Sequence, residues 1–186
     1  MGFKQFIEES KKAKAYVMDV DDTLITSNAK IKVLDKSGED IKSLTPQEYS
    51  TYKLKNGEQF DFSEFRDKKV LVTTAKKTDY WQVAQNVNDA VKRGDSTSVL
   101  YILTARPDAF KKDLYNYLKS SGLDTLKMNN VYTVGDRGAD LSVAQLKKIS
   151  LKHIKKKHSE VSYFDDDTKN IELANELKTI KARQVK

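Results

Sequence analysis

The sequence contains no cysteine, which excludes disulfide bonds, thiolate-bound zinc and cysteine nucleophiles. Histidine is almost absent as well. The only two, His153 and His158, lie five residues apart in a lysine-rich stretch, which argues against a histidine metal site or a Ser-His-Asp triad. A metal ion bound to this chain would therefore be a hard cation held by oxygen ligands, and Mg²⁺ is the main candidate.

Long apolar runs are also missing. The longest, residues 99–103, has five residues, whereas a membrane-spanning helix needs about 20. The first ten residues carry acidic side chains where a signal peptide needs an apolar core, so we expect a cytoplasmic protein. A length of 186 residues predicts a single domain, residues 1–186, with a hydrophobic core of its own.

Negative charge is in deficit, because 34 lysine and arginine residues face 27 acidic ones, which leaves a net charge of +7. The resulting pI of about 9.3 favours anionic partners such as nucleotides or nucleic acid. A charged, solvated surface without a partner is the alternative interpretation.

The apolar pattern predicts short buried strands that alternate with amphipathic helices. This alternation predicts an α/β fold in which a parallel sheet is covered by helices on both faces. Residues 27–68 interrupt the pattern and predict a small cap or flap inserted after the first strand, and a further short strand is expected at 70–72. We expect main strands at 15–20, 98–103, 131–134 and 161–164, and helices over about 78–93, 107–121, 141–157 and 168–180.

Acidic side chains follow three of the four predicted strands. Parallel sheets bind ligands at the carboxyl ends of their strands, so these side chains should share one crevice. Carboxylates crowded in this way repel one another unless a cation lies among them, which predicts a divalent metal site. Asp19 and Asp21, two residues apart on an extended segment, can face one reaction centre. The strand ends carry Asp19, Asp21 and Asp22, then Thr104 and Arg106, then Asp136 and Arg137, and finally Asp165, Asp166 and Asp167.

The segment Asp19-Val-Asp-Asp-Thr23, preceded by apolar Tyr16-Val-Met18, resembles the first signature of the haloacid dehalogenase (HAD) superfamily, in its Asp-x-Asp-x-Thr phosphatase branch. Thr104 matches the second signature, a Thr or Ser that ends the next sheet strand. Asp165-Asp166 match the fourth, an acidic pair. The matches occur in the family's order and span residues 15–170.

The third signature is a lysine upstream of the fourth strand, for which Lys147, Lys148 and Lys152 are candidates. Lys147 shares a helix face with Leu151 and Ile154, so its stem can lie along the sheet while its amine reaches the crevice. We therefore favour Lys147, with Lys148 second.

The resemblance implies a three-layer, Rossmann-like (HAD-like) fold and a Mg²⁺-dependent phosphatase that works through an aspartyl-phosphate. In this scheme Asp19 is the nucleophile and Asp21 the general acid and base. Thr104 and Lys147 bind the phosphoryl oxygens. Mg²⁺ is held by Asp19, by the main-chain carbonyl of Asp21 and by Asp165, with Asp166 close by or reaching it through water.

Three points stay open. Residues 135–140 also resemble a variant of the fourth signature, in which case the required lysine would be Lys119 or Lys127. If they are not that signature, Asp136 and Arg137 are loop residues beside the crevice that could touch substrate. Arg106 could bind a second phosphate or pair with an acid at the sheet edge.

The substrate signal is weaker. A small cap leaves the crevice open and suits a large substrate, and aromatic residues in the insertion could stack on a base or only pack it. The helix before the fourth strand is rich in lysine and could track a phosphate backbone. These features resemble the polynucleotide 3′-phosphatase and RNA-repair-like HAD domains, often phage-encoded, which would place the protein in a host cytoplasm.

The resemblance therefore favours a nucleotide or a polynucleotide end phosphate as substrate. The alternatives are a metal-dependent nuclease and a non-catalytic nucleic-acid-binding module on the same scaffold. The oligomeric state is not predicted by the sequence. The aromatic residues of the insertion are Tyr49, Tyr52, Phe60, Phe62 and Phe65.

Overall fold

The computed structural model describes residues 12–135 and 140–185. They form two compact units, which we describe separately: a main unit within Met1–Thr26 and Lys76–Lys186, and an inserted unit, Ser27–Ala75. The inserted unit therefore runs past the predicted limit at residue 68. Residues 70–72, expected as a strand, lie instead in helix α3 (Lys68–Thr74), which begins at Asp67 because the Asp67 carboxylate accepts hydrogen bonds from two backbone N–H groups of the first turn.

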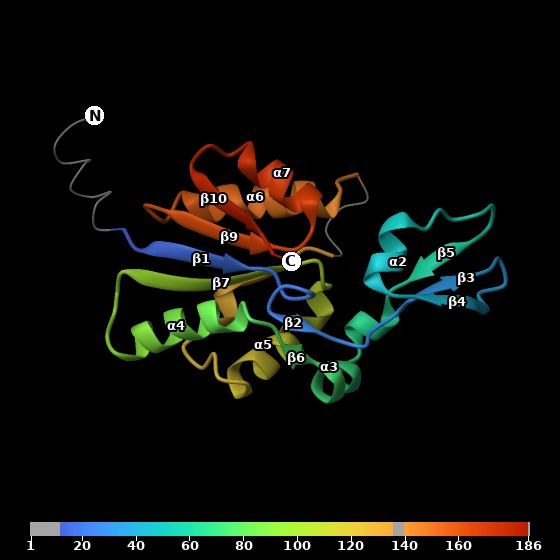
Figure 1. The fold of residues 1–186 in the computed structure, drawn as a ribbon, viewed down its shortest axis with the longest axis horizontal. Coiled ribbons are helices and arrows are strands. Elements are labelled where there is room, and N and C mark those ends of the chain that lie inside the picture. Colours follow the sequence, from blue (N-terminus) through green and yellow to red (C-terminus); the bar gives the residue numbers. More distant parts are fainter. Residues whose placement is uncertain (1–11, 136–139, 186) are drawn as a thin grey trace. The chain divides into compact units, whose positions relative to one another are not determined.

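The main unit is built on a five-stranded sheet with the order β10-β9-β1-β7-β8, in which every pairing is parallel (Figure 1). The parallel sheet predicted from the sequence is thus confirmed. Because β1 lies between β7 and β9, the carboxyl ends of all three strands meet at one edge of the sheet. The strands are β1 (Lys14–Met18), β7 (Ser98–Thr104), β8 (Val131–Thr133), β9 (Val161–Asp165) and β10 (Ile180–Gln184).

Helices cover both faces of this sheet, so the main unit has three layers (Figure 1). Helices α4 (Trp81–Lys92) and α5 (Lys111–Ser120) lie on one face, and α6 (Val143–Lys155) and α7 (Thr168–Asn175) lie on the other. The core between the sheet and the second pair contains Val17, Leu103, Leu151 and Ile154, all fully buried. None of the helices in the described residues has the length and apolar content needed to cross a membrane.

The edge strand β10 was not predicted. The helical periodicity suggested a last helix over 168–180, but α7 ends at Asn175 and Ile180 begins β10. Ile180 fits the apolar spacing of α7 and is buried, whereas the following Lys181-Ala-Arg-Gln184 segment has no apolar run. An edge strand pairs on one side only and needs less apolar surface, so its sequence carries a weak signal.

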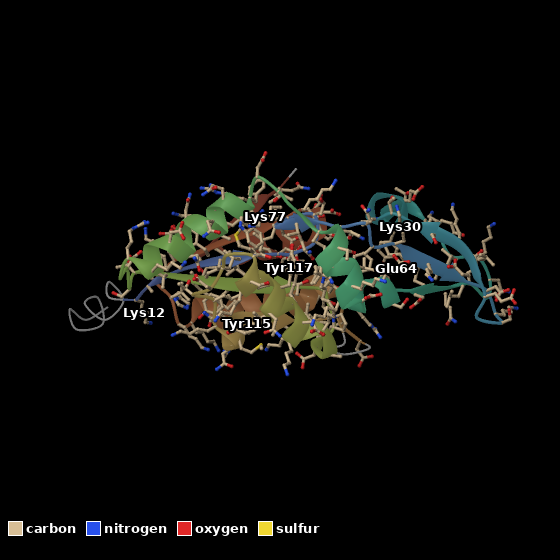
Figure 2. The ribbon with its side chains drawn as sticks, turned by 90° about the horizontal axis from the view of Figure 1, so that it is seen from below. Lys12, Lys30, Glu64, Lys77, Tyr115 and Tyr117 are labelled. Atoms are coloured by element: carbon tan, nitrogen blue, oxygen red, sulfur yellow. The ribbon has the colours of Figure 1, made fainter. Side chains whose placement is uncertain are left out.

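The inserted unit has a small antiparallel sheet with the order β4-β3-β5, made of β3 (Ile31–Leu34), β4 (Asp40–Leu44) and β5 (Gln59–Asp61). Its core consists of Ile31, Val33 and Leu44 with aromatic rings packed against them. Helix α2 (Pro46–Thr51) begins with a capping box. The Lys30 backbone N–H donates to the Glu64 carboxylate at 2.8 Å, and Figure 2 labels both residues.

The main unit supplies the strand pair at which the chain leaves for the inserted unit and returns from it. Strand β2 (Ile25–Thr26) pairs antiparallel with β6 (Lys76–Lys77). The Thr78 hydroxyl donates to the backbone carbonyl of Thr23, which fastens this pair to the turn that follows β1. The two crossing points are therefore fixed relative to the carboxyl edge of the main sheet.

Candidate active site

The first part of the site is the turn that follows β1. The backbone N–H of Asp19 donates to the Phe164 carbonyl at 2.9 Å, so the chain stays registered with β9 beyond the end of the β1 ladder. Val20 is fully buried. Asp22 has φ 56°, an unusual left-handed conformation for a residue other than glycine, and it reverses the chain. This turn leaves Asp19 buried in the crevice and Asp21 partly exposed at its border.

The second part is the end of β9. Asp165 is fully buried, and its carboxylate accepts hydrogen bonds from the Asn170 amide and from the Asp167 backbone N–H, both at 2.9 Å, and from the Tyr163 hydroxyl. The Asp167 carboxylate in turn caps the N-terminus of α7. These partners fix the Asp165 carboxylate in one orientation. Tyr163 and Asn170 are not among the site residues predicted from the sequence, although the two-residue spacing of Tyr163 from Asp165 places both on one face of the strand.

A single lysine joins the two strand ends. The Lys147 Nζ atom lies 2.7 Å from Asp19 Oδ1 and 2.7 Å from Asp165 Oδ2. Its side chain is 3% exposed. The capping box of Ser142 and Gln145 begins α6 and places Lys147 in the second turn of the helix. Lys148, the second choice from the sequence, forms an ion pair with Glu176 instead.

The end of β7 contributes Thr104 and Arg106. Thr104 is fully buried, and its Oγ accepts the Arg106 backbone N–H at 3.2 Å, so its own hydrogen can be donated to a ligand. Arg106 is buried and donates two hydrogen bonds to the Asp21 carboxylate, from Nε to Oδ2 at 2.9 Å and from Nη2 to Oδ1 at 2.7 Å. Of the two roles open for Arg106, pairing with an acid is the one its contacts match.

Gly135 keeps this turn in place. A Cβ atom at this position would lie 2.1 Å from the Ala105 carbonyl oxygen, a distance that real Cβ atoms do not reach. The Gly135 backbone N–H donates to the Arg106 carbonyl at 3.3 Å. The two loops therefore pack backbone against backbone, and only glycine permits it. Asp136 and Arg137, expected beside the crevice, lie outside the described residues.

Negative charge exceeds positive charge in the site. In the part of the chain that the structure describes, Asp19, Asp21, Asp165 and Asp166, with Asp22 beside Asp21, lie together with two cations, Lys147 and Arg106. Burial raises the pKa of Asp19 well above its ordinary value, and the three other carboxylates add to this although Lys147 opposes it. Burial and the charge of Asp165 raise the pKa of Asp166 to about 6.

Lys147 remains charged in this environment. Burial alone would lower the pKa of its ammonium, but the neighbouring Asp19, Tyr163 and Asp165 raise it well above its ordinary value. Loss of water is the largest single effect on this ammonium, but the neighbouring acidic groups together outweigh it. Lys147 can therefore attract an anionic ligand without first gaining a proton.

The carboxylates have the arrangement that a metal ion requires. One oxygen from each of Asp19, Asp165 and Asp166 lies within 4.8 Å of the other two. Carboxylate oxygens are the donors that Mg²⁺ prefers. The residues present therefore fit a Mg²⁺ ion.

The chain resembles known proteins in sequence and in fold. A family model described as mitochondrial PGP phosphatase matches residues 3–156, and the match ends before Asp165 and Asp166. Two solved structures of the HAD domain of effector protein Lem4 from Legionella pneumophila are similar. The inactive mutant is 12% identical over 95% of this chain and 87% of that chain, with a TM-score of 0.48. The other is 14% identical over 94% and 86%, with a TM-score of 0.44. No curated protein matches.

Proposed function

The chain belongs to the mitochondrial PGP phosphatase family and is a HAD-type phosphatase, and from this premise we propose how it acts and on what. We propose that it hydrolyses phosphomonoesters with Mg²⁺ through an aspartyl-phosphate on Asp19. The observation that carries this proposal is the Lys147 ammonium between Asp19 and Asp165, because it puts a nucleophile, a phosphate-binding cation and a metal ligand in one buried cluster.

Asp19 and Asp21 divide the chemistry between them. The Asp19 carboxylate attacks phosphorus and forms a P–O bond, while the bond to the leaving oxygen breaks and Asp21, which enters this step as the carboxylic acid, gives that oxygen its proton. Asp21 then takes a proton from the water that attacks the aspartyl-phosphate, which releases inorganic phosphate and restores the Asp19 carboxylate. The two contacts from Arg106 hold the Asp21 carboxylate in position for both proton transfers.

Lys147 and Thr104 have the chemistry needed to bind the transferring phosphoryl group. The Lys147 ammonium supplies three N–H donors, of which the two carboxylates use two. The Thr104 hydroxyl supplies an O–H donor from the end of the neighbouring strand. Donors that are fixed before the substrate arrives stabilise the charge that develops on the phosphoryl oxygens without reorganisation.

Asp19, Asp165 and Asp166, with the main-chain carbonyl of Asp21, would hold Mg²⁺. When bound, the ion supplies positive charge that offsets the repulsion between the attacking carboxylate and the phosphate. Burial raises the pKa of Asp19 and the neighbouring carboxylates raise it further, and a cation bound there would act in the opposite direction.

We further propose that the substrate is a nucleotide or the end phosphate of a polynucleotide. The net charge of +7 supports an anionic substrate that is larger than one phosphate. Base stacking by the insertion is less well supported, because Tyr49, Phe60 and Phe62 pack edge to face or tilted against one another. The name of the matched family gives PGP as a second substrate class to test.

The test is phosphate release from a panel of nucleotides, 3′- and 5′-phosphorylated oligonucleotides, sugar phosphates and PGP, with Mg²⁺ and with a chelator. We expect release that requires Mg²⁺ and is abolished by Asp19→Asn. The matched control is Asp79→Asn, the same chemical change at an exposed carboxylate. Full activity of Asp19→Asn would contradict the nucleophile, and cleavage of internal phosphodiesters without phosphate release would instead indicate a nuclease.

A further inference from the structure

A second concave site lies in the main unit, away from the carboxylate cluster. It is a pocket of about 430 Å³, and every side chain that lines it is polar. Four of the six are basic. We call this the lysine pocket, and it is lined by Lys12, Lys155, Lys156, His158, Ser159 and Thr179.

The lysine pocket lies at the amino edge of the sheet, opposite the candidate active site. Lys12 precedes β1 and Ser159 precedes β9, and Figure 2 shows Lys12 at the amino end of β1. Helix α6 links the two sites, with Lys147 in its second turn and Lys156 as its C-cap. Nine residues of α-helix rise roughly 14 Å, so a ligand must be at least that long to reach both.

The positive charge of the lysine pocket is not neutralised by the described part of the chain. Lys12 and Lys156 form no ion pair there, and the Lys155 ammonium donates only to the backbone carbonyls of His158 and Ser159. Burial lowers the pKa of His158, and the charges of Lys157, Lys155 and Lys12 lower it further. A concave surface with uncompensated cations and donors facing it attracts an anion.

We propose that the lysine pocket binds the phosphodiester backbone of a single-stranded nucleic acid whose end phosphate occupies the candidate active site, an inference that rests on the function proposed above. Exposed Lys152 lies one turn before Lys156 on α6 and provides a cation between the two sites. A strand that advances about 3.4 Å per nucleotide would need roughly four nucleotides to span the roughly 14 Å between Lys147 and Lys156, and a more extended strand would need fewer.

The chemistry of the pocket favours a nucleic acid over a membrane. A peripheral membrane surface inserts apolar or aromatic side chains into the bilayer, and all six lining residues are polar. A concave pocket also cannot seat a flat bilayer as it can a strand. The only ring in the lining is the imidazole of His158, which is buried and has both nitrogens bonded, one to the Tyr101 hydroxyl and one to the Ala13 carbonyl. Because no ring in the lining is free for a base to stack on, we expect the backbone to be bound without sequence preference.

The test compares Lys12→Glu/Lys156→Glu with Lys112→Glu/Lys127→Glu. All four lysines are exposed, and the control pair changes the net charge equally at α5 and the segment that follows it. Binding is measured by fluorescence anisotropy with a labelled thymidine octanucleotide that lacks an end phosphate, so no turnover is needed. Phosphate release is measured in parallel from thymidylate, from the 3′- or 5′-phosphorylated octanucleotide, whichever is hydrolysed, and from para-nitrophenyl phosphate.

We expect the pocket variant to bind the octanucleotide at least about tenfold more weakly than the control at 50 mM salt. The slope of the logarithm of the binding constant against the logarithm of the salt concentration should be less steep by about 1.4, because two phosphate contacts are lost. Its KM for the phosphorylated octanucleotide should rise while its activity on para-nitrophenyl phosphate stays unchanged. Equal binding by both variants would overturn the proposal. So would loss of binding to phosphatidylglycerol vesicles with octanucleotide binding intact, which would indicate a membrane site.

The two assays distinguish failure of the phosphatase proposal from failure of the lysine-pocket proposal. If no panel substrate releases phosphate, the phosphatase assignment of the cluster fails, yet the anisotropy comparison still decides whether the lysine pocket binds a strand. Far-UV circular dichroism and melting temperature of both variants show whether a change in binding reflects a change in fold. A pocket variant that melts like the control and binds like it refutes the site.

Discussion

Replacing Lys147 with methionine tests the charge balance of the site most directly. Methionine keeps much of the volume of the stem and removes the ammonium that lies 2.7 Å from Asp19 and from Asp165. Both carboxylates are almost fully buried, so the substitution leaves uncompensated charge in the interior. Removing one partner of a buried ion pair destabilises a protein by about 3–5 kcal/mol.

The adjacent Lys148 is the matched control. It pairs with Glu176, whose side chain is 56% exposed, and exposed ion pairs contribute about 0–1 kcal/mol. For a chain of this size about 1 kcal/mol shifts the melting temperature by roughly 2–4 °C. Lys147→Met should therefore lower the melting temperature by roughly 6–20 °C without Mg²⁺, and Lys148→Met by about 4 °C or less.

The assay is thermal and urea unfolding of the parent and both variants, with a chelator and with Mg²⁺. Because Lys147→Met increases the negative charge of the cluster, Mg²⁺ should raise its melting temperature by more than it raises that of the parent. Phosphatase activity should fall by about 10²–10³-fold, the loss typical for one donor to a transition state. Equal melting temperatures for the two variants, or a Mg²⁺ effect that is unchanged in Lys147→Met, would refute the reasoning.

Three further substitutions test neighbouring contacts. Arg106→Gln should misplace Asp21 and reduce kcat on alkyl phosphates by about 10²-fold. The loss should be smaller on aryl phosphates, because their leaving groups need no general acid. A series of substrates with different leaving groups measures this difference. Folding lowers the pKa of His158 below its usual 6.5, so its contribution to the free energy of unfolding should be fully present above pH 6.5. Below pH 6.5 the free energy of unfolding should fall by at most about 1.4 kcal/mol per pH unit. Urea unfolding at several pH values should show a weaker pH dependence for His158→Asn. Gly135→Ala should cost about 1–3 kcal/mol in urea unfolding and reduce kcat, because its Cβ would displace the Ala105 carbonyl.

The main sheet could be predicted because its signals are local. Strands β1, β7 and β9 are short apolar runs buried on both faces, and each is followed by the polar turn that ends it. Strand β10 and helix α3 lacked such signals. Ile180 fitted the helical spacing of α7, and Val70-Leu-Val72 is β-branched although the Asp67 cap makes it helical.

In the inserted unit, too, only features with a local sequence signal could be predicted. The hairpin of β3 and β4 has a local signal in the turn Asp35-Lys-Ser-Gly38, where the glycine has φ 84°. The C-terminal limit of the inserted unit has no such signal. A strand predicted at 70–72 does not indicate that the unit continues to Ala75. The aromatic residues could be read as a stacking surface or as packing, and contacts such as that between Tyr49 and Phe60 rings, 4.8 Å apart, exist only in the folded unit.

The carboxylates of the site follow from local spacing in the sequence, whereas for the groups that neutralise them the sequence leaves alternatives. Asp19 and Asp21 are two residues apart, so their common direction follows from strand geometry alone. Arg106 contacts Asp21 across 85 residues, and Lys147 contacts Asp19 across 128. The separation of residues along the chain does not show which of several lysines contacts a carboxylate so far away in the sequence. Helix geometry favours Lys147, because it shares a helix face with Leu151 and Ile154, which are fully buried. Lys148 is rotated by about 100° from Lys147 around the helix and pairs with Glu176.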